Sequence, residues 1–199
     1  MKRRAVLAGS GITLLTPVVG CLTTRKRDGE TGGENGQASI RIVDVTADPP
    51  PDLPIEPAVS VVTAEATATT PASIAVGWEN TDDRAVRAGE ADSIVFSATR
   101  SKDENVQLLA FDRIGDRSEK VSFEDCWYVS GDLVFDGDYE VIDLEPGKRH
   151  TAEPDLYASD DACLTSDSYE FETLVSVEDQ YGREEKTEEW GFALDINVG

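Results

Sequence analysis

The sequence predicts an all-β protein, a single antiparallel β-sandwich that follows a cleaved signal peptide and a flexible tether. Apolar and polar residues alternate in several short stretches, as at Ile74, Val76 and Trp78. Turn-forming Asn, Asp, Gly and Pro residues separate these stretches at close spacing. No apolar stripe of helical period continues for three turns, so any helix is expected to be a single turn near residues 112–118 or 155–159.

Residues 1–21 form an N-terminal segment in which Arg3 and Arg4 precede an uncharged apolar run that ends at Cys21. The run is shorter than the roughly 20 apolar residues that a membrane-spanning helix needs, which favours a cleaved signal peptide. The two arginines resemble a twin-arginine export signal, and residues 18–21 resemble a lipobox. The resemblance implies a thioether-linked lipid on Cys21, which would anchor the protein at the extracellular face of the cell membrane. An uncleaved N-terminus, or a signal cut elsewhere, is the alternative.

Residues 22–38 are expected to be a disordered polar tether. From Thr23 onward they contain no Val, Ile, Leu or aromatic residue and are dense in Gly, Thr and Glu, so they bury too little apolar surface to offset their ordering entropy. Arg25, Lys26 and Arg27 would either face anionic head groups or only keep the segment soluble. The folded domain is expected to span residues 39–199.

The chain is strongly acidic, with 40 Asp and Glu residues against 18 Lys and Arg residues and a net charge of −22. The only charges before Cys21 are those of Lys2, Arg3 and Arg4, so removing these three takes the net charge from −22 to −25. Such a domain expands by self-repulsion unless salt screens it, and at 1 M salt the Debye length is about 3 Å. A surface this acidic also repels phosphate, so nucleic acid is not an expected partner.

The acidity has two possible explanations. A disordered chain is one, but hydrophobic residues make up 39% of the sequence and three tryptophans are present, which favours a folded domain. Adaptation to concentrated salt is the other. Together with Arg3, Arg4 and Cys21, the acidity resembles that of lipid-anchored surface proteins of halophilic archaea, and the resemblance implies a halophilic protein.

Alternation and turn signals locate the expected strands of the domain. They are residues 40–45, 59–62, 74–78, 94–98, 106–111, 127–129 with 133–135, 139–144, 169–177 and 190–198. Residues 48–57 contain five prolines, which cannot donate to a strand ladder. This stretch is therefore expected to be an edge crossing or a polyproline strap between sheets.

Two turns carry a further resemblance. In residues 143–147, Pro146 presets the backbone for the first central position of a turn and Gly147 supplies the positive φ of the second. This turn and the strand after it resemble those of immunoglobulin-like domains on prokaryotic surface proteins, and residues 78–82 are similar to a strand end and Asn/Asp turn of such domains. The resemblance implies an immunoglobulin-like sandwich and assigns no functional residue.

With Cys21 assigned to lipid, Cys126 and Cys163 remain as an even pair in an oxidising exterior. We expect a disulfide between them, with two free buried thiols as the alternative. Both cysteines flank polar turns, which favours a link between surface loops rather than a bridge in the core.

The sequence predicts no cofactor, metal or catalytic site. His150 is the only histidine, so a blue-copper site is excluded, and a zinc site would need His150, both remaining cysteines and a carboxylate. A Ser-His-Asp triad is formally available, but a solvated turn histidine is the preferred interpretation. Acidic clusters are better explained by solvation than by calcium. The two clusters weighed are Asp132, Asp136, Asp138 and Glu140, and Asp155, Asp160 and Asp161.

We therefore expect a non-catalytic, lipid-anchored extracellular β-sandwich that acts by binding or structure at the cell surface. Its expected partner is the membrane, through the lipid on Cys21, and the sequence specifies no protein or small-molecule partner. Two alternatives belong to other classes. One is a small secreted hydrolase with an unrecognised site, and the other is an accessory ligand-binding subunit of a transport system.

Overall fold

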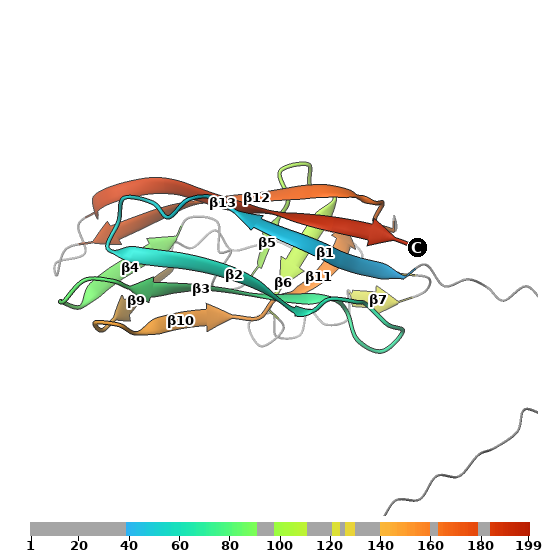
Figure 1. Ribbon diagram of the computed structural model, residues 1–199, viewed down its shortest axis with the longest axis horizontal. Helices are drawn as coiled ribbons and strands as arrows, with labels where there is room; N and C mark the ends of the chain where they lie inside the picture. Colours follow the sequence, from blue (N-terminus) through green and yellow to red (C-terminus); the bar gives the residue numbers. More distant parts are fainter. Residues whose placement is uncertain are drawn as a thin grey trace, which may run out of the picture. The chain divides into compact units, whose positions relative to one another are not determined.

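Two facing β-sheets make up the part of the chain that the computed structural model describes, which comprises residues 39–90, 98–110, 121–123, 126–129, 140–159, 163–178 and 184–199 (Figure 1). These ranges contain no helix, so none of them contains a helix able to span a membrane. The predicted signal peptide and tether lie outside the described residues, as do Arg3, Arg4 and Cys21. So do the expected strand segments 94–97 and 133–135 and the expected helical turn at 112–118.

The first sheet has five antiparallel strands. In spatial order they are β1 (Ile40–Ala47), β13 (Glu184–Val198), β12 (Asp167–Glu178), β4 (Val86–Glu90) and β9 (Glu140–Leu144). The long β12–β13 hairpin is its centre, because the pairing runs from Asp167 opposite Ile196 to Glu178 opposite Glu184.

The second sheet has eight strands. Its main path is β10 (Arg149–Ala152), β3 (Ser73–Asn80), β11 (Asp155–Ser159), β6 (Val106–Leu109) and β5 (Ala98–Arg100). Beside this path lie β2 (Ile55–Thr63), β7 (Val121–Phe123) and β8 (Trp127–Val129). The pairing is antiparallel except between β8 and β11, where Ala158 lies opposite Tyr128 in a parallel register.

The core lies between the sheets and uses the residues that the alternation predicted. Ile74, Val76 and Trp78 of β3 are fully buried. From the first sheet, Phe171 and Phe192 stack with ring centroids 5.1 Å apart. Since each apolar face is buried against the other sheet, the prediction of an all-β sandwich is confirmed.

The proline-rich segment crosses between the sheets, as predicted. At one end Asp48 N donates to Gly191 O in the first sheet (2.9 Å), and at the other Thr81 N donates to Pro54 O beside the second (3.0 Å). Strand β2 then begins at Ile55 and, among the described strands, forms a ladder with β3 alone. Pro57 therefore lies on an edge strand, where its missing N–H disrupts no ladder.

Hydrogen bonds link the two sheets along both sides of the sandwich. On one side Ile42 N of β1 donates to Ala64 O (2.8 Å), just after β2. On the other side Lys102 N, in the β5–β6 turn, donates to Glu170 O of β12 (2.8 Å). The chain ends of the domain also pair, because Gly199 N donates to Ser39 O (3.0 Å).

One of the two stretches where a helical turn was expected, if any formed, is a strand, and three further strands were not predicted. Residues 155–159 form β11, and both of its faces are buried because Leu156 and Ala158 enter the main core while Tyr157 packs on the opposite side. The sequence therefore lacks alternation there. Strands β4, β7 (Val121–Phe123) and β10 were missed because each is short, with three to five residues, which is too few for a clear alternation.

The turn at Pro146 and Gly147 has the predicted geometry. Lys148 N donates to Glu145 O (2.9 Å), and Gly147 has a φ of 66°. This is the arrangement of a type II turn, which places proline and then glycine at the two central positions.

Candidate functional site

The predicted disulfide between Cys126 and Cys163 is present, with Cα atoms 5.7 Å apart and a sequence separation of 37 residues. Its expected placement between surface loops is only half right. Cys163 is exposed, but Cys126 is 2% exposed and belongs to the main core. The bond therefore attaches an exposed segment to the packed interior.

Trp127, the neighbour of Cys126, covers a second and smaller core. Its indole Nε1 donates to Thr67 O (2.7 Å), and its ring lies edge-on to Tyr157 with centroids 6.2 Å apart. This cluster also contains Ala98, Leu109 and Val129. Tyr157 projects from β11 away from the main core, so the small core covers the outer face of the second sheet.

Polar side chains lie beside this small core in one row across three strands. Arg100 of β5 is opposite Gln107 of β6, and Gln107 is opposite Tyr157 of β11. Gln107 is 2% exposed, and its Nε2 donates to Ser159 Oγ (3.2 Å). Its Oε1 is buried and has no hydrogen-bond partner in the part of the chain that the structure describes. A buried amide oxygen of this kind is an acceptor, and leaving it unpaired costs free energy.

Tyr157 of this row contacts Asp155, which lies two residues earlier on β11. Tyr157 Oη donates to Asp155 Oδ2 (3.3 Å). Burial raises the pKa of Asp155. Burial also raises the pKa of Tyr157 far above its usual value, and the negative charge of the nearby Asp155 adds to that shift. Tyr157 therefore stays protonated at neutral pH and acts as a hydrogen-bond donor, not as a base or nucleophile.

His150 does not lie in a turn, which corrects the sequence interpretation. It lies in β10, half-buried, in register with Trp78 of β3. In the described ranges no three His, Cys, Asp or Glu residues are grouped so as to hold a metal ion. In the two acidic clusters of the sequence, Asp155 lies on β11. The other members lie outside the described residues, namely Asp132, Asp136, Asp138, Asp160, Asp161 and the side chain of Glu140.

Two surface lysines, Lys102 and Lys186, are each paired with two acidic side chains. Lys102 forms ion pairs with Glu172 and Glu170, and these carboxylates raise its pKa. Lys186 bridges Asp52 (2.7 Å) and Glu188 (3.0 Å), with the same effect on its pKa. The charge of each of these two lysines is already balanced by its own carboxylate partners. Neither lysine therefore offsets much of the repulsion among the other carboxylates of the surface.

No protein-family model, curated protein or solved structure matches this chain. Sequence reasoning found the two cysteines but missed Trp127, Gln107 and Tyr157 as members of one cluster. Only strand register brings these residues together, and the sequence gives no direct signal of register between strands that lie far apart in the chain.

Proposed function

We propose that this protein is an exported, lipid-anchored surface protein whose immunoglobulin-like β-sandwich acts by binding or structure and not by catalysis. The disulfide between Cys126 and Cys163 is the observation that carries the proposal. Disulfides form and persist in oxidising compartments outside the cytosol. Because the chain has three cysteines, this pairing leaves Cys21 as the one cysteine available for a lipid.

The proposed arrangement places the domain outside the cell on a short tether. Arg3 and Arg4 direct export, the signal is cut before Cys21, and lipid on Cys21 holds the chain to the membrane. Residues 22–38 separate the membrane from the first strand, which begins at Ile40. The net charge of −22 suits a domain that works in concentrated salt, since salt screens the repulsion among its carboxylates.

The described residues favour binding or structure over catalysis. Tyr157 is held protonated by its surroundings, and His150 lies within a strand. A cysteine nucleophile needs a free thiolate, and the two described cysteines are joined to each other. The proposal therefore assigns the domain no reaction.

Fractionation of cells that express the full chain tests the anchor. The unaltered protein and a Thr23→Ser control should remain with the membrane, whereas Cys21→Ser should appear in the medium or as an unprocessed precursor. The double substitution Arg3→Lys with Arg4→Lys should block export and leave the precursor inside the cell. A Cys21→Ser protein that loses its signal and still sediments with the membrane would contradict the proposal.

A further inference from the structure

Strand β2 leaves one edge of the second sheet open within the described residues, because its only ladder partner is β3. The hydrogen bonds of β3 show which backbone groups face that edge. Asn80 N donates to Lys148 O (2.9 Å) and Ile74 N donates to Pro154 O (3.2 Å), both on the side of β3 away from β2. The backbone groups of every second residue of β3, from Ile74 to Asn80, therefore point away from β2. In an antiparallel ladder the β2 residues opposite them belong to non-hydrogen-bonded pairs, so their own backbone groups point to the open edge. These residues are Val61, Val59, Pro57 and Ile55.

The usable part of this edge is short. Pro57 has no N–H to offer. Beyond the register shift between Val61 and Thr63, β1 already occupies the edge, because Ile42 N donates to Ala64 O. Between Pro57 and this shift, the residues that can both donate and accept at the edge are Val59 and Val61. Prolines and bulges are devices that limit edge pairing, and here they confine it to a defined register.

This short edge is also uncharged and partly apolar. Residues 57–64 contain no charged side chain, in a chain whose net charge is −22. Val61 is 38% exposed and Val62 is 51% exposed, and Ser60 between the edge-facing valines is exposed as well. Any protein of similar charge is repelled by most of this surface, so the uncharged edge is where two acidic molecules approach each other at the least electrostatic cost.

We propose that two copies of this chain associate through β2, as an antiparallel strand pair whose two-fold axis passes beside Ser60. The sequence Val59-Ser60-Val61 is symmetric about its centre, so each copy offers the other the same two edge-facing valines. Val59 of one copy lies opposite Val61 of the other, and each such pair exchanges two backbone hydrogen bonds. An isologous contact of this kind closes as a dimer and does not propagate into a filament.

The register places acidic residues at both ends of the pair. When Ser60 lies opposite Ser60 of the second copy, Glu56 of one copy lies opposite Ala64 of the other, next to Glu65. Carboxylates this close repel, and salt screens that repulsion. The dimer is therefore stronger in molar salt than in dilute salt, and Glu56→Lys shifts it toward association in dilute salt by replacing repulsion with attraction.

Cysteine cross-linking of the full chain in molar salt tests the register. Side chains at the axis belong to a non-hydrogen-bonded pair, where Cα atoms lie about 4.5 Å apart, close enough for a disulfide. Ser60→Cys should form a disulfide-linked dimer under mild oxidation. Ser168→Cys is the matched control, because Ser168 is exposed but lies on β12 of the first sheet. Equal cross-linking of the two variants would overturn the proposal.

Sedimentation of the detergent-solubilised full chain tests the association itself. Ser60→Glu puts two carboxylates face to face at the axis and should weaken the dimer at least tenfold, whereas Leu174→Glu, at an exposed position of β12, should not. Urea unfolding of both variants checks that each remains folded. A monomer at all concentrations in molar salt, a dimer indifferent to Ser60→Glu, or a stoichiometric complex with a different chain through this edge would each overturn the proposal.

Discussion

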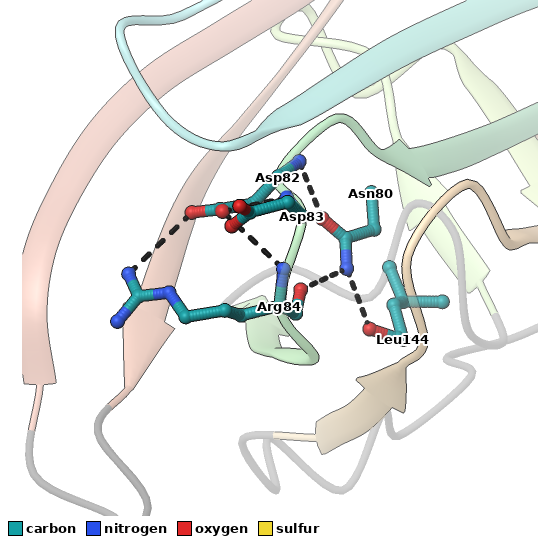
Figure 2. Close-up of polar contacts among 5 residues, drawn as sticks. All are labelled: Asn80, Asp82, Asp83, Arg84 and Leu144. Carbon is teal, nitrogen blue, oxygen red and sulfur yellow. Dashed lines mark hydrogen bonds and ion pairs between the residues drawn. The ribbon is translucent and has the colours of Figure 1, made fainter.

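The side chain of Asn80 donates a 2.7 Å hydrogen bond from Nδ2 to the backbone oxygen of Leu144, 64 residues later in the chain. Asn80 ends β3 in the second sheet, and Leu144 ends β9 in the first (Figure 2). The same Nδ2 donates to Arg84 O (2.8 Å), and Oδ1 accepts from Asp82 N (2.8 Å). Since Asn80 is 1% exposed, one buried amide links the two sheets at this end of the sandwich.

Replacing this amide should destabilise the fold. Asn80→Ala leaves the carbonyl oxygens of Leu144 and Arg84 without their donor, and each unsatisfied buried group costs about 1 to 3 kcal/mol. We expect the free energy of unfolding to fall by about 3 kcal/mol, measured by urea unfolding in molar salt with tryptophan fluorescence. Asn105→Ala is the control, because the Asn105 side chain bonds to Asp103 at the surface and should matter little. Equal effects of the two substitutions would refute the role of Asn80.

Loss of the disulfide should be costly. In the chain-entropy model a loop of this length contributes about 4 kcal/mol, so Cys126→Ala with Cys163→Ala should lower the melting temperature clearly. Thiol labelling of the unfolded, unreduced chain should find neither cysteine reactive in the unaltered protein. Detection of two reactive thiols there would show that the bond does not form.

Asp155 should make stability depend on pH in the direction opposite to most surface carboxylates. Burial raises its pKa in the folded protein above the ordinary 3.8, so its stabilising contribution is present below that value and is lost as pH rises through the raised pKa. Asp155→Asn should therefore melt at a higher temperature than the unaltered protein at pH 7, and the difference should shrink below about pH 4.

The matched control for Asp155 is Asp143→Asn, at an exposed position of β9. Both substitutions remove one negative charge from an acidic molecule, so the general relief of repulsion is the same in each. Only the effect of burial differs. A pH profile of the melting temperature that is identical for the two variants would exclude the buried contribution of Asp155.

Salt should stabilise the domain. The Debye length grows from about 3 Å at 1 M to about 30 Å at 0.01 M, so repulsion among the carboxylates spreads across the surface as salt is withdrawn. We expect the melting temperature to fall through that series, followed by fluorescence of the three tryptophans. A neutral osmolyte at equal osmolality is the control, because it is excluded from the protein surface as salt is but does not screen charge. A melting temperature that is constant across the series would mean that the acidity has another role.

The sequence predicted elements in which one face is buried and the other exposed. Strand β12 is the clearest, because Tyr169, Phe171 and Val175 are buried while Glu170 and Leu174 between them are exposed. Strand β11 was mistaken for a helical turn because Tyr157 is buried on the face where alternation requires an exposed residue. A second layer over one face of a sheet removes the local signal of a strand.

Contacts between distant segments had no local signal either. The turn at Pro146 and Gly147 follows from two adjacent residues, and the disulfide follows from counting cysteines and from the oxidising compartment that the expected export signal implies. The link from Asn80 to Leu144 and the row from Arg100 to Tyr157 depend on strand order, which alternation does not encode. The position of the open β2 edge depends on strand order as well.

The first residue of the mature protein tests the central proposal most directly. Mass spectrometry of the N-terminal peptide, from protein purified out of the membrane, should find Cys21 as the first residue with the added mass of a thioether-linked lipid. An N-terminal peptide that begins elsewhere, or that begins at an unmodified Cys21, would contradict the account of a lipid-anchored surface protein.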